Sequence, residues 1–336
     1  MSRGDPKGVL RSAEEILLLA FCLRFAVIGV CSHGNYCFEP TLPSARLFLK
    51  FSEMMAATNE VVHLNFDDAW DGRQFGFATL DLRGWGPRLR FSAPGREIER
   101  FAAEEAGALP PSLVYGSGDF HHLTAVWLRR FSRLTTVVSF DNHPDWDVRP
   151  PRWACGAWVN RALELSQIAK VSVWGCGNFE CWWPARITGN NWAERAGRLE
   201  LHPWADDRSA QEQKRRGAIL RSNWRENFEE FLERLSGGEV YVTIDLDCVR
   251  AEEAVTNWES GRFSLEDLTW ALKSLGTKGT LAGWDICGAW SPPRYARWKQ
   301  RFAANFDHPK IILPSAAEIR RRNHAALDRL LPLLTQ

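Results

Sequence analysis

Short apolar runs alternate with longer amphipathic segments along most of the chain. Runs rich in β-branched and aromatic residues predict six buried strands at residues 61–66, 112–115, 134–140, 168–174, 239–244 and 280–284. Helical periodicity predicts helices at residues 44–57, 96–105, 123–131, 157–167, 210–235, 265–275 and 316–334. This alternation predicts a three-layer α/β/α fold, in which a central, mostly parallel sheet carries helices on both faces.

The N-terminal part of the chain differs from the rest. Residues 16–31 are apolar except for Arg24, and this run is short for a bilayer span and carries a charge in its middle. We therefore expect residues 1–55 to form an extension and helical lead-in, and residues 56–336 to form a single α/β domain. A secretion signal within residues 16–31 stays open as an alternative.

Composition narrows the class of protein. The 336 residues contain 42 Lys and Arg against 41 Asp and Glu, a net charge of +1, so nucleic acid is not expected as a partner. A membrane partner is not expected either. The eight cysteines form no CxxC pair, which predicts reduced thiols in a cytoplasmic protein. The 17 tryptophans either pack loops rigidly or line a substrate pocket.

Three of the predicted strands run directly into acidic or imidazole side chains. These are His121 and His122 after residue 115, Asp141, His143 and Asp145 after residue 140, and Asp245 and Asp247 after residue 244. Parallel strands place their carboxyl ends at one edge of a sheet, and alternate residues of an extended segment point the same way. Carboxylates gathered at such an edge repel each other unless cations join them. An oxygen-rich set with a few imidazoles suits Mn(II), so we expect a two-metal site.

These residues resemble the signatures of the ureohydrolase family, which includes arginases, agmatinases, formiminoglutamases and guanidinases. Residues 141–145 (Asp-Asn-His-Pro-Asp) are similar to the family's Asp-Ala-His-x-Asp. Residues 243–247 (Thr-Ile-Asp-Leu-Asp) are similar to the first half of its Ser-x-Asp-x-Asp-x-x-Asp-Pro. The family's Gly-Gly-Asp-His-Ser is matched loosely, with His121 at the metal histidine and His122 at the serine, and His122 is the alternative ligand.

The resemblance, which covers roughly residues 60–330, implies an arginase-like fold with a mostly parallel sheet of about eight strands. It implies two Mn(II) ions per chain, with nickel, iron or zinc as alternatives, and a metal-bridging hydroxide that attacks a linear C–N bond of a small guanidino or amidino compound. One ion would be held by His121, Asp141, Asp145 and Asp245, and the other by Asp141, His143, Asp245 and Asp247. Asp141 and Asp245 would bridge the ions, and Asp145 would also hold the hydroxide. Family members are often oligomers, so a homo-oligomer stays open.

The chain departs from the family pattern at positions that would contact substrate. Gly288 stands where arginase and agmatinase carry the Glu that binds the guanidinium group. Cys155 replaces the histidine that shuttles protons in arginase, and a thiol is a weaker shuttle near neutral pH. Asp147 stands where some members contact the tail of the substrate, although it could equally be a surface charge or a partner of a ligand.

Two alternatives follow from these departures. The missing Glu at Gly288 favours an amide hydrolase of the deacetylase type, whereas Asp145 favours a ureohydrolase because the deacetylase pattern lacks that third ligand. The departures at Cys155, Gly288 and residues 250–251 (Arg-Ala in place of Asp-Pro) together favour a catalytically silent protein that holds metal and binds a ligand.

Overall fold

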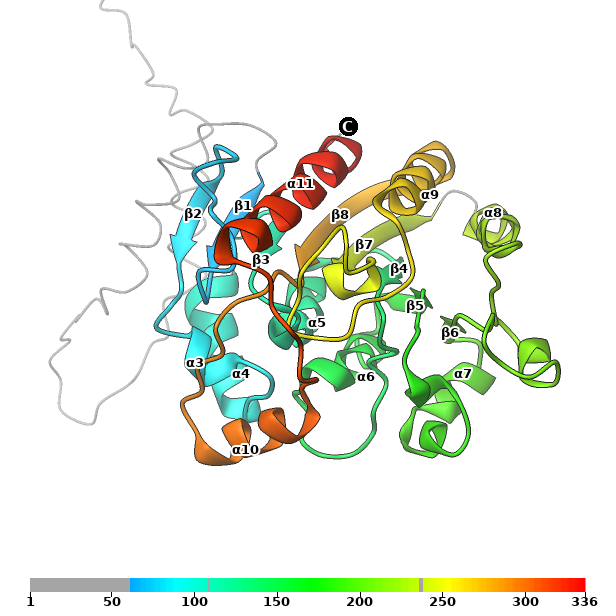
Figure 1. Cartoon of the computed structure of the whole chain (residues 1–336), viewed down its shortest axis with the longest axis horizontal. Helices are drawn as coiled ribbons and strands as arrows, with labels where there is room; N and C mark the ends of the chain where they lie inside the picture. The colour runs from blue at the N-terminus through cyan, green and yellow to red at the C-terminus, as the bar shows by residue number, and fades with distance from the viewer. Residues whose placement is uncertain (1–60, 108, 236–237, 336) are drawn as a thin grey trace, which may run out of the picture. The chain divides into compact units, whose positions relative to one another are not determined.

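The computed structural model describes residues 61–107, 109–235 and 238–335. Within this part of the chain, eight strands form one sheet in the order β2-β1-β3-β8-β7-β4-β5-β6, and all seven pairings are parallel (Figure 1). The strands are β1 Val62–Asn65, β2 Ala78–Asp81, β3 Ser112–Tyr115, β4 Thr135–Phe140, β5 Ile168–Trp174, β6 Leu199–His202, β7 Glu239–Asp245 and β8 Thr280–Cys287. The predicted α/β class and the eight-stranded sheet are therefore confirmed.

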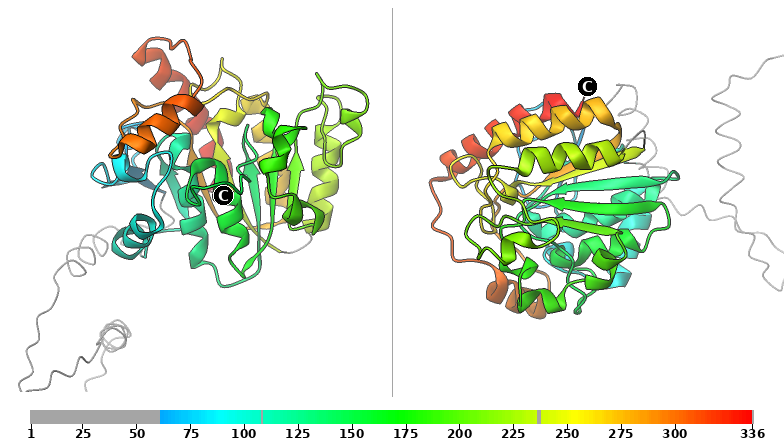
Figure 2. Two further views of the ribbon diagram at one scale, coloured as in Figure 1. Left: turned by 90° about the horizontal axis from the view of Figure 1, so that it is seen from below. Right: turned by 90° about the vertical axis from the view of Figure 1, so that its right-hand side faces the viewer.

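Helices cover both faces of the sheet. They are α3 Gly86–Leu89, α4 Gly95–Phe101, α5 Thr124–Trp127, α6 Trp158–Leu163, α7 Asn191–Arg195, α8 Trp224–Leu235, α9 Leu265–Lys278, α10 Trp298–Asp307 and α11 Ala316–Leu334. Helices α8, α9 and α11 share one apolar core with the sheet, and α4, α5 and α6 pack into the cores of the opposite face. Figure 2 shows this three-layer arrangement edge-on.

The two strands that the sequence pattern missed are the two edges of the sheet. The side chains of β2 are alternately half-buried and exposed, and β6 reads Leu-Glu-Leu-His. An edge strand buries less apolar surface than a central one, so its pattern gives a weaker signal.

The predicted helix at 210–235 is wrong in its first half. The helix begins only at Trp224, and the segment before it consists of turns and one short 3₁₀ helix, Glu212–Lys214. Gly217 adopts a positive φ of 79°, which a right-handed helix does not accommodate, and Ile219 pairs with Trp204 in an isolated bridge. Helix α10 was not predicted at all.

The expectations for residues 1–55, for the helix at 44–57 and for a signal within 16–31 lie outside the described residues. Among the residues that are described, no helix combines the length and the apolar character needed to cross a membrane. Most of the 17 tryptophans serve packing, because eleven of them are buried: Trp70, Trp85, Trp127, Trp146, Trp158, Trp174, Trp182, Trp204, Trp224, Trp258 and Trp284.

Candidate metal centre

The central strands of the sheet bring the predicted metal ligands together at their carboxyl ends. In the parallel register, Phe140 at the end of β4 lies beside Ile244 of β7, so Asp141 and Asp245 follow at the same level. Strand β8 lies on the other side of β7 and pairs Cys287 with Asp245. The carboxyl ends of β4, β7 and β8 are therefore adjacent, which is where ligands bind in open α/β sheets.

One group of side chains surrounds His121, which lies in the 3₁₀ helix Gly118–Leu123 after β3. Its Nδ1 atom lies 3.1 Å from Oδ2 of Asp141 and 3.3 Å from Oδ2 of Asp145. The same Nδ1 atom lies 3.6 Å from Oδ2 of Asp245. All four side chains are buried. Three strand ends thus deliver one imidazole and three carboxylates to one point.

A second group adjoins the first and shares Asp141 with it. Nδ1 of His143 lies 2.8 Å from Oδ2 of Asp247 and 3.8 Å from Oδ1 of Asp141. The candidate ligand atoms of these three residues lie within 4.8 Å of one another, close enough to hold one ion. The structure thus brings together all six predicted ligands, and their role as ligands stays a prediction.

Backbone N–H groups fix the orientation of the carboxylates. The amide of His143 donates to Oδ1 of Asp141 at 2.7 Å, and the amide of Asn142 donates to Oδ1 of Asp247 at 3.0 Å. The amide of Asp247 donates to Oδ1 of Asp245 at 3.1 Å. Each of these carboxylates therefore has one oxygen held by the backbone, and its other oxygen lies beside a histidine of the cluster.

The atoms that face each other in the cluster fit a bound cation. Oδ2 of Asp141 and Nδ1 of His121 are buried and have no hydrogen-bond partner. Among the described residues, no Lys or Arg forms an ion pair with any of the carboxylates of Asp141, Asp145, Asp245 and Asp247. Buried carboxylates without a compensating charge are strongly unfavourable, so this donor set fits divalent cations.

The pKa values show the same crowding of charge. Burial, together with Asp145 and Asp247, raises the pKa of Asp141 well above its usual range. Burial and the neighbouring Asp247 raise the pKa of Asp245 to about 7. Burial alone would lower the pKa of His121, but its contacts with Asp141 and Asp145 raise it well above the ordinary value. The cluster thus holds more negative charge than its own histidines can balance.

Asp145 has an unusual backbone conformation. Its φ is +45°, in the left-handed region that residues other than glycine rarely adopt. Its carbonyl accepts a hydrogen bond from the amide of Val159 at 3.1 Å, which ties this turn to helix α6. Strained backbone of this kind is concentrated at functional sites, and here it accompanies a side chain aimed at His121.

A chain of hydrogen bonds that the sequence pattern does not predict supports His121. Nε2 of His121 lies 2.9 Å from the hydroxyl of Thr243, and that hydroxyl donates to Oδ1 of Asp285 at 2.7 Å. The hydroxyls of Tyr241 and Tyr115 also donate to Asp285, at 2.8 and 3.2 Å. Because β7 and β8 pair Thr243 with Asp285, the register of the strands was the signal that could have found this support.

Cys287 also adjoins the centre, although the sequence pattern does not predict it there. Its thiol lies 3.6 Å from Oδ2 of Asp245 and donates to it. With His121 and Asp245 it forms a third group whose candidate ligand atoms lie within 4.8 Å of one another. Burial raises the pKa of this thiol well above its usual range, so the thiol is protonated in the absence of a cation.

Asp119 does not join the metal cluster, although it lies only two residues before His121. It forms a buried ion pair with Arg90, whose Nε lies 2.6 Å from Oδ2, and its Oδ1 lies 2.6 Å from Nε2 of His308. Burial would raise the pKa of Asp119, but Arg90 and His308 lower it to about 2. The pair fixes the loop that carries His121.

The other predicted site residues lie around the cluster. Both ring nitrogens of His122 are buried without a partner, and burial lowers the pKa of this residue to about 3. His122 belongs to none of the candidate metal groups among the described residues, whereas His121 belongs to two. Cys155 is buried, and burial together with Asp119 and Asp145 raises the pKa of its thiol well above the usual value.

An ion pair holds the side chain of Asp147, and the backbone at Gly288 excludes any side chain. Asp147 forms an ion pair with Arg149, whose Nη2 lies 2.5 Å from its Oδ2. Gly288 has a φ of +101°, and a Cβ atom there would lie 2.2 Å from Oδ1 of Asp245. No side chain, and therefore no Glu, fits at position 288 with this backbone.

Two acids outside the cluster lie beside it. Oε2 of Glu259 lies 3.4 Å from Nε2 of His143. Glu180, in the loop after β5, is half-buried, and burial raises its pKa to about 7; among the neighbouring charges, His143 lowers this pKa and Asp145 raises it. Two indoles also border the cluster, because Trp158 packs against His121 and Trp258 packs against His143.

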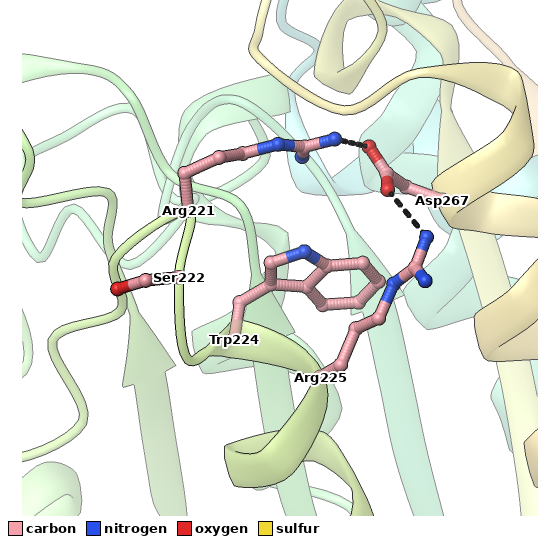
Figure 3. A pocket seen from close by; sticks show the side chains of 5 residues that line it. All are labelled: Arg221, Ser222, Trp224, Arg225 and Asp267. Atoms are coloured by element: carbon pink, nitrogen blue, oxygen red, sulfur yellow. Dashed lines mark hydrogen bonds and ion pairs between the residues drawn. The ribbon is translucent and has the colours of Figure 1, made fainter.

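One cavity of about 250 Å³ lies away from the centre, between α8 and α9 (Figure 3). Arg221 and Arg225 line it and both donate to Asp267, at 2.5 and 3.2 Å. Asp267 also caps the N-terminus of α9 together with Ser264. The cavity contains none of the predicted site residues, and its charges are explained by the ion pairs that join the two helices.

The fold and the cluster together define an arginase-like α/β protein with a candidate centre for two metal ions. Formimidoylglutamase from Bacillus subtilis has a similar structure, with a TM-score of 0.50 and 11% identity, over 82% of this chain and 86% of that one. Arginase from Medicago truncatula is 16% identical over 87% of this chain and 93% of its own, with a TM-score of 0.49. The ureohydrolase resemblance is thus confirmed at the level of the fold.

Comparisons of the sequence alone do not identify a family for this chain. A protein of Thermotoga maritima, described as uncharacterized, is 30% identical over 206 residues, which cover 61% of this chain and 66% of that protein. No model of a protein family matches the chain.

Proposed function

We propose that this protein is a hydrolase of linear C–N bonds that uses a pair of divalent cations, with Mn(II) as the native metal and a small guanidino or amidino compound as substrate. The observation that supports this most strongly is that Nδ1 of His121 and Oδ2 of Asp141 lie 3.1 Å apart, both buried and neither with a hydrogen-bond partner. When bound, a pair of ions lowers the pKa of a shared water toward neutrality and polarises the substrate. The likeness of the fold to formimidoylglutamase is consistent with this class of reaction.

The residues divide naturally between two ions. His121, Asp141, Asp145 and Asp245 would hold one, and Asp141, His143, Asp245 and Asp247 would hold the other. Four carboxylates and two imidazoles form a donor set that suits Mn(II). The thiol of Cys287 adjoins the first of these sites, and a sulfur ligand would favour zinc or iron instead.

We assign the role of proton donor to Cys155. Because the pKa of its thiol is well above the usual value, Sγ keeps its hydrogen at neutral pH and is a weak acid, which gives this hydrogen up only to a strongly basic atom such as the nitrogen of a leaving amine. Its neighbour Gly156 lies against Asp145, since a Cβ at position 156 would lie 4.0 Å from Oδ1 of Asp145. Cys155 would therefore protonate the amine that leaves when the C–N bond breaks.

The acids beside the cluster support a cationic substrate. Glu259 is exposed, and its Oε2 lies 3.4 Å from Nε2 of His143; Glu180 is half-buried, and the charge of His143 lowers its pKa. They would attract an amidinium or guanidinium group in the absence of a Glu at position 288. Asp147 would contact the tail of the substrate only if it separated from Arg149.

A second candidate, an amide hydrolase, is favoured by Gly288. The contact between this glycine and Asp245 excludes the carboxylate that grips a guanidinium group in arginase-like enzymes. An amide has no cation to bind and would need no such partner.

A panel of substrates separates the candidates. Purified protein loaded with Mn(II) would be incubated with guanidino, formimino and N-acetyl compounds, with release of urea, ammonia and acetate measured. We expect nitrogen release from a guanidino or amidino compound and its loss in Asp141→Asn. Acetate release alone would support the amide hydrolase, and metal binding without any turnover would support a silent binding protein.

A further inference from the structure

Helix α10 exposes its large apolar side chains and buries its small and polar ones. Gln300 and Ala304 face the protein and are buried. Trp298, Phe302 and Phe306 are 71%, 69% and 89% exposed. Their spacing of four residues places them on one face of the helix. This reverses the usual arrangement, in which the apolar face of a surface helix packs against the core.

The orientation of α10 is fixed at both ends. Nη2 of Arg297 donates to the carbonyl of Arg88 at 2.9 Å and to that of Ser92 at 2.7 Å. Beyond the other end, Nε2 of His308 lies 2.6 Å from Oδ1 of the buried Asp119. The aromatic side chains therefore point outward because the opposite side of the helix is anchored.

Exposed apolar side chains also follow the helix in the sequence. Ile312 is 97% exposed, and its neighbours Ile311 and Leu313 are also exposed. We call this surface, which consists of Trp298, Phe302, Phe306 and residues 311–313, the α10 face. Nothing in the described part of the chain covers these side chains, and large exposed apolar side chains gathered in this way mark interaction sites.

The segment of the chain that carries the α10 face is basic. Residues 292–313 contain five Lys or Arg residues and one acid, Asp307. Lys299, Arg301 and Lys310 are exposed beside the aromatic side chains. A combination of aromatic and basic side chains is typical of helices that lie in the interface of an anionic membrane.

A second segment of the chain also exposes large apolar side chains. Phe179, Trp183 and Ile187, in the segment after β5, are each more than 60% exposed. In Figure 1 both regions lie below the sheet, at the edge to which its strands point.

We propose that the α10 face binds the surface of an anionic lipid bilayer without crossing it. Trp298, Phe302 and Phe306 would insert between the headgroups, and the adjacent Lys and Arg side chains would pair with lipid phosphates. A second copy of the chain is the less favourable occupant, since a symmetric contact would bring the same basic side chains together. The proposal departs from the sequence-based expectation of no membrane partner and does not depend on the hydrolase activity.

Vesicle sedimentation tests the proposal with the full-length protein. Binding would be measured to vesicles of phosphatidylcholine alone and of equal parts phosphatidylcholine and phosphatidylserine, at low and high salt. The variants are Trp298→Ser/Phe302→Ser/Phe306→Ser, which removes the aromatic side chains, and Lys299→Glu/Arg301→Glu, which reverses the charge. Leu134→Ser is the matched control. Leu134 is 66% exposed and immediately precedes β4, so it lies at the end of the sheet where the strands begin, opposite to their carboxyl ends.

We expect wild type and Leu134→Ser to bind the vesicles that contain phosphatidylserine, and to bind less as salt rises. Both α10 variants should bind at least roughly tenfold more weakly, with unchanged melting temperatures and metal content. Equal binding by wild type and the aromatic variant would overturn the proposal, as would no binding by wild type. Sedimentation velocity in the absence of vesicles gives the oligomer mass. If wild type does not bind vesicles and the aromatic variant has a smaller oligomer mass than wild type, the face would be assigned to a second copy instead.

Discussion

The backbone of Gly288 lies directly against the carboxylate of Asp245. A Cβ atom at position 288 would lie 2.2 Å from Oδ1 of Asp245 and 2.4 Å from the amide nitrogen of Leu246. The positive φ of Gly288 would also strain any other residue. The glycine is therefore part of what positions this candidate ligand, and it does more than leave a space where the family has a Glu.

Replacing Gly288 with Ala should displace Asp245 and impair the centre. We expect a loss of at least about 2 kcal/mol of unfolding free energy from the strained backbone and the close contact. We also expect metal content to fall below half of the wild-type level. The measurements are chemical denaturation and elemental analysis. Gly276→Ala is the control, because Gly276 lies inside α9 with open space around it, and it should leave both quantities unchanged or raise stability slightly.

The raised pKa of Asp245 predicts a pH-dependent loss of stability in protein stripped of metal. A carboxyl group with a higher pKa in the folded state favours folding at low pH, and this contribution is lost as the pH rises through the folded pKa, here about 7. Relative to Asp245→Asn, the wild type should lose on the order of 4 kcal/mol between about pH 4 and pH 7. Urea unfolding in the presence of a chelator measures this difference.

The comparison with Asp245→Asn is needed because other groups act in the opposite direction. Burial lowers the pKa of His63 to about 4 and that of His122 to about 3, so these residues stabilise the fold as the pH rises. Their contributions cancel between the two proteins. Without metal, Asp245→Asn should be more stable than the wild type at pH 7. Adding Mn(II) should make the wild type the more stable of the two. If the difference in unfolding free energy between wild type and Asp245→Asn did not change with pH, the raised pKa of Asp245 would be contradicted.

Thr243 should act as a positioning residue for His121. Thr243→Val keeps the shape of the side chain but removes the hydroxyl that joins His121 to Asp285. We expect metal affinity to fall about 10- to 100-fold, as for other groups that orient metal-binding histidines. Calorimetric titration with Mn(II) measures the change, and Thr243→Ser should restore most of the affinity. Unchanged affinity in Thr243→Val would show that this chain of hydrogen bonds is incidental.

Cys155 should affect turnover without affecting metal binding. If its thiol protonates the leaving amine, Cys155→Ala should lower kcat by about 100-fold, within the range of general acid catalysis. KM and metal content should stay near the wild-type values. Steady-state kinetics on the best substrate of the panel provides the measurement. An unchanged kcat would remove Cys155 from the proposed reaction.

The sequence could predict the candidate ligands because their pattern is local. Asp141, His143 and Asp145 follow one buried strand, and Asp245 and Asp247 follow another, so hydrophobic patterning and parallel topology suffice to bring them together. His121 required the resemblance to a family signature, since the neighbouring His122 offers the same chemistry. In the structure His121 points into the cluster, and both ring nitrogens of His122 lie buried without partners.

The rest of the site depends on relationships that the sequence does not display. The contact of Asp285 with Thr243 follows from the register of β7 and β8, and register cannot be read from either strand alone. The predicted strand at 280–284 ended too early, because β8 continues to Cys287. Helix α10 was missed because its aromatic residues face outward, which obscures the pattern of a helix packed against a core.

The most direct test of the account is the stoichiometry of Mn(II) binding. Protein stripped of metal would be titrated with Mn(II) by calorimetry, and electron paramagnetic resonance would show whether the bound ions are magnetically coupled. The account predicts two coupled ions per chain in the wild type, and less than one in Asp141→Asn, in which the side chain shared by both groups is altered. A folded wild type that binds no divalent cation, or an Asp141→Asn variant that binds two, would contradict the central claim.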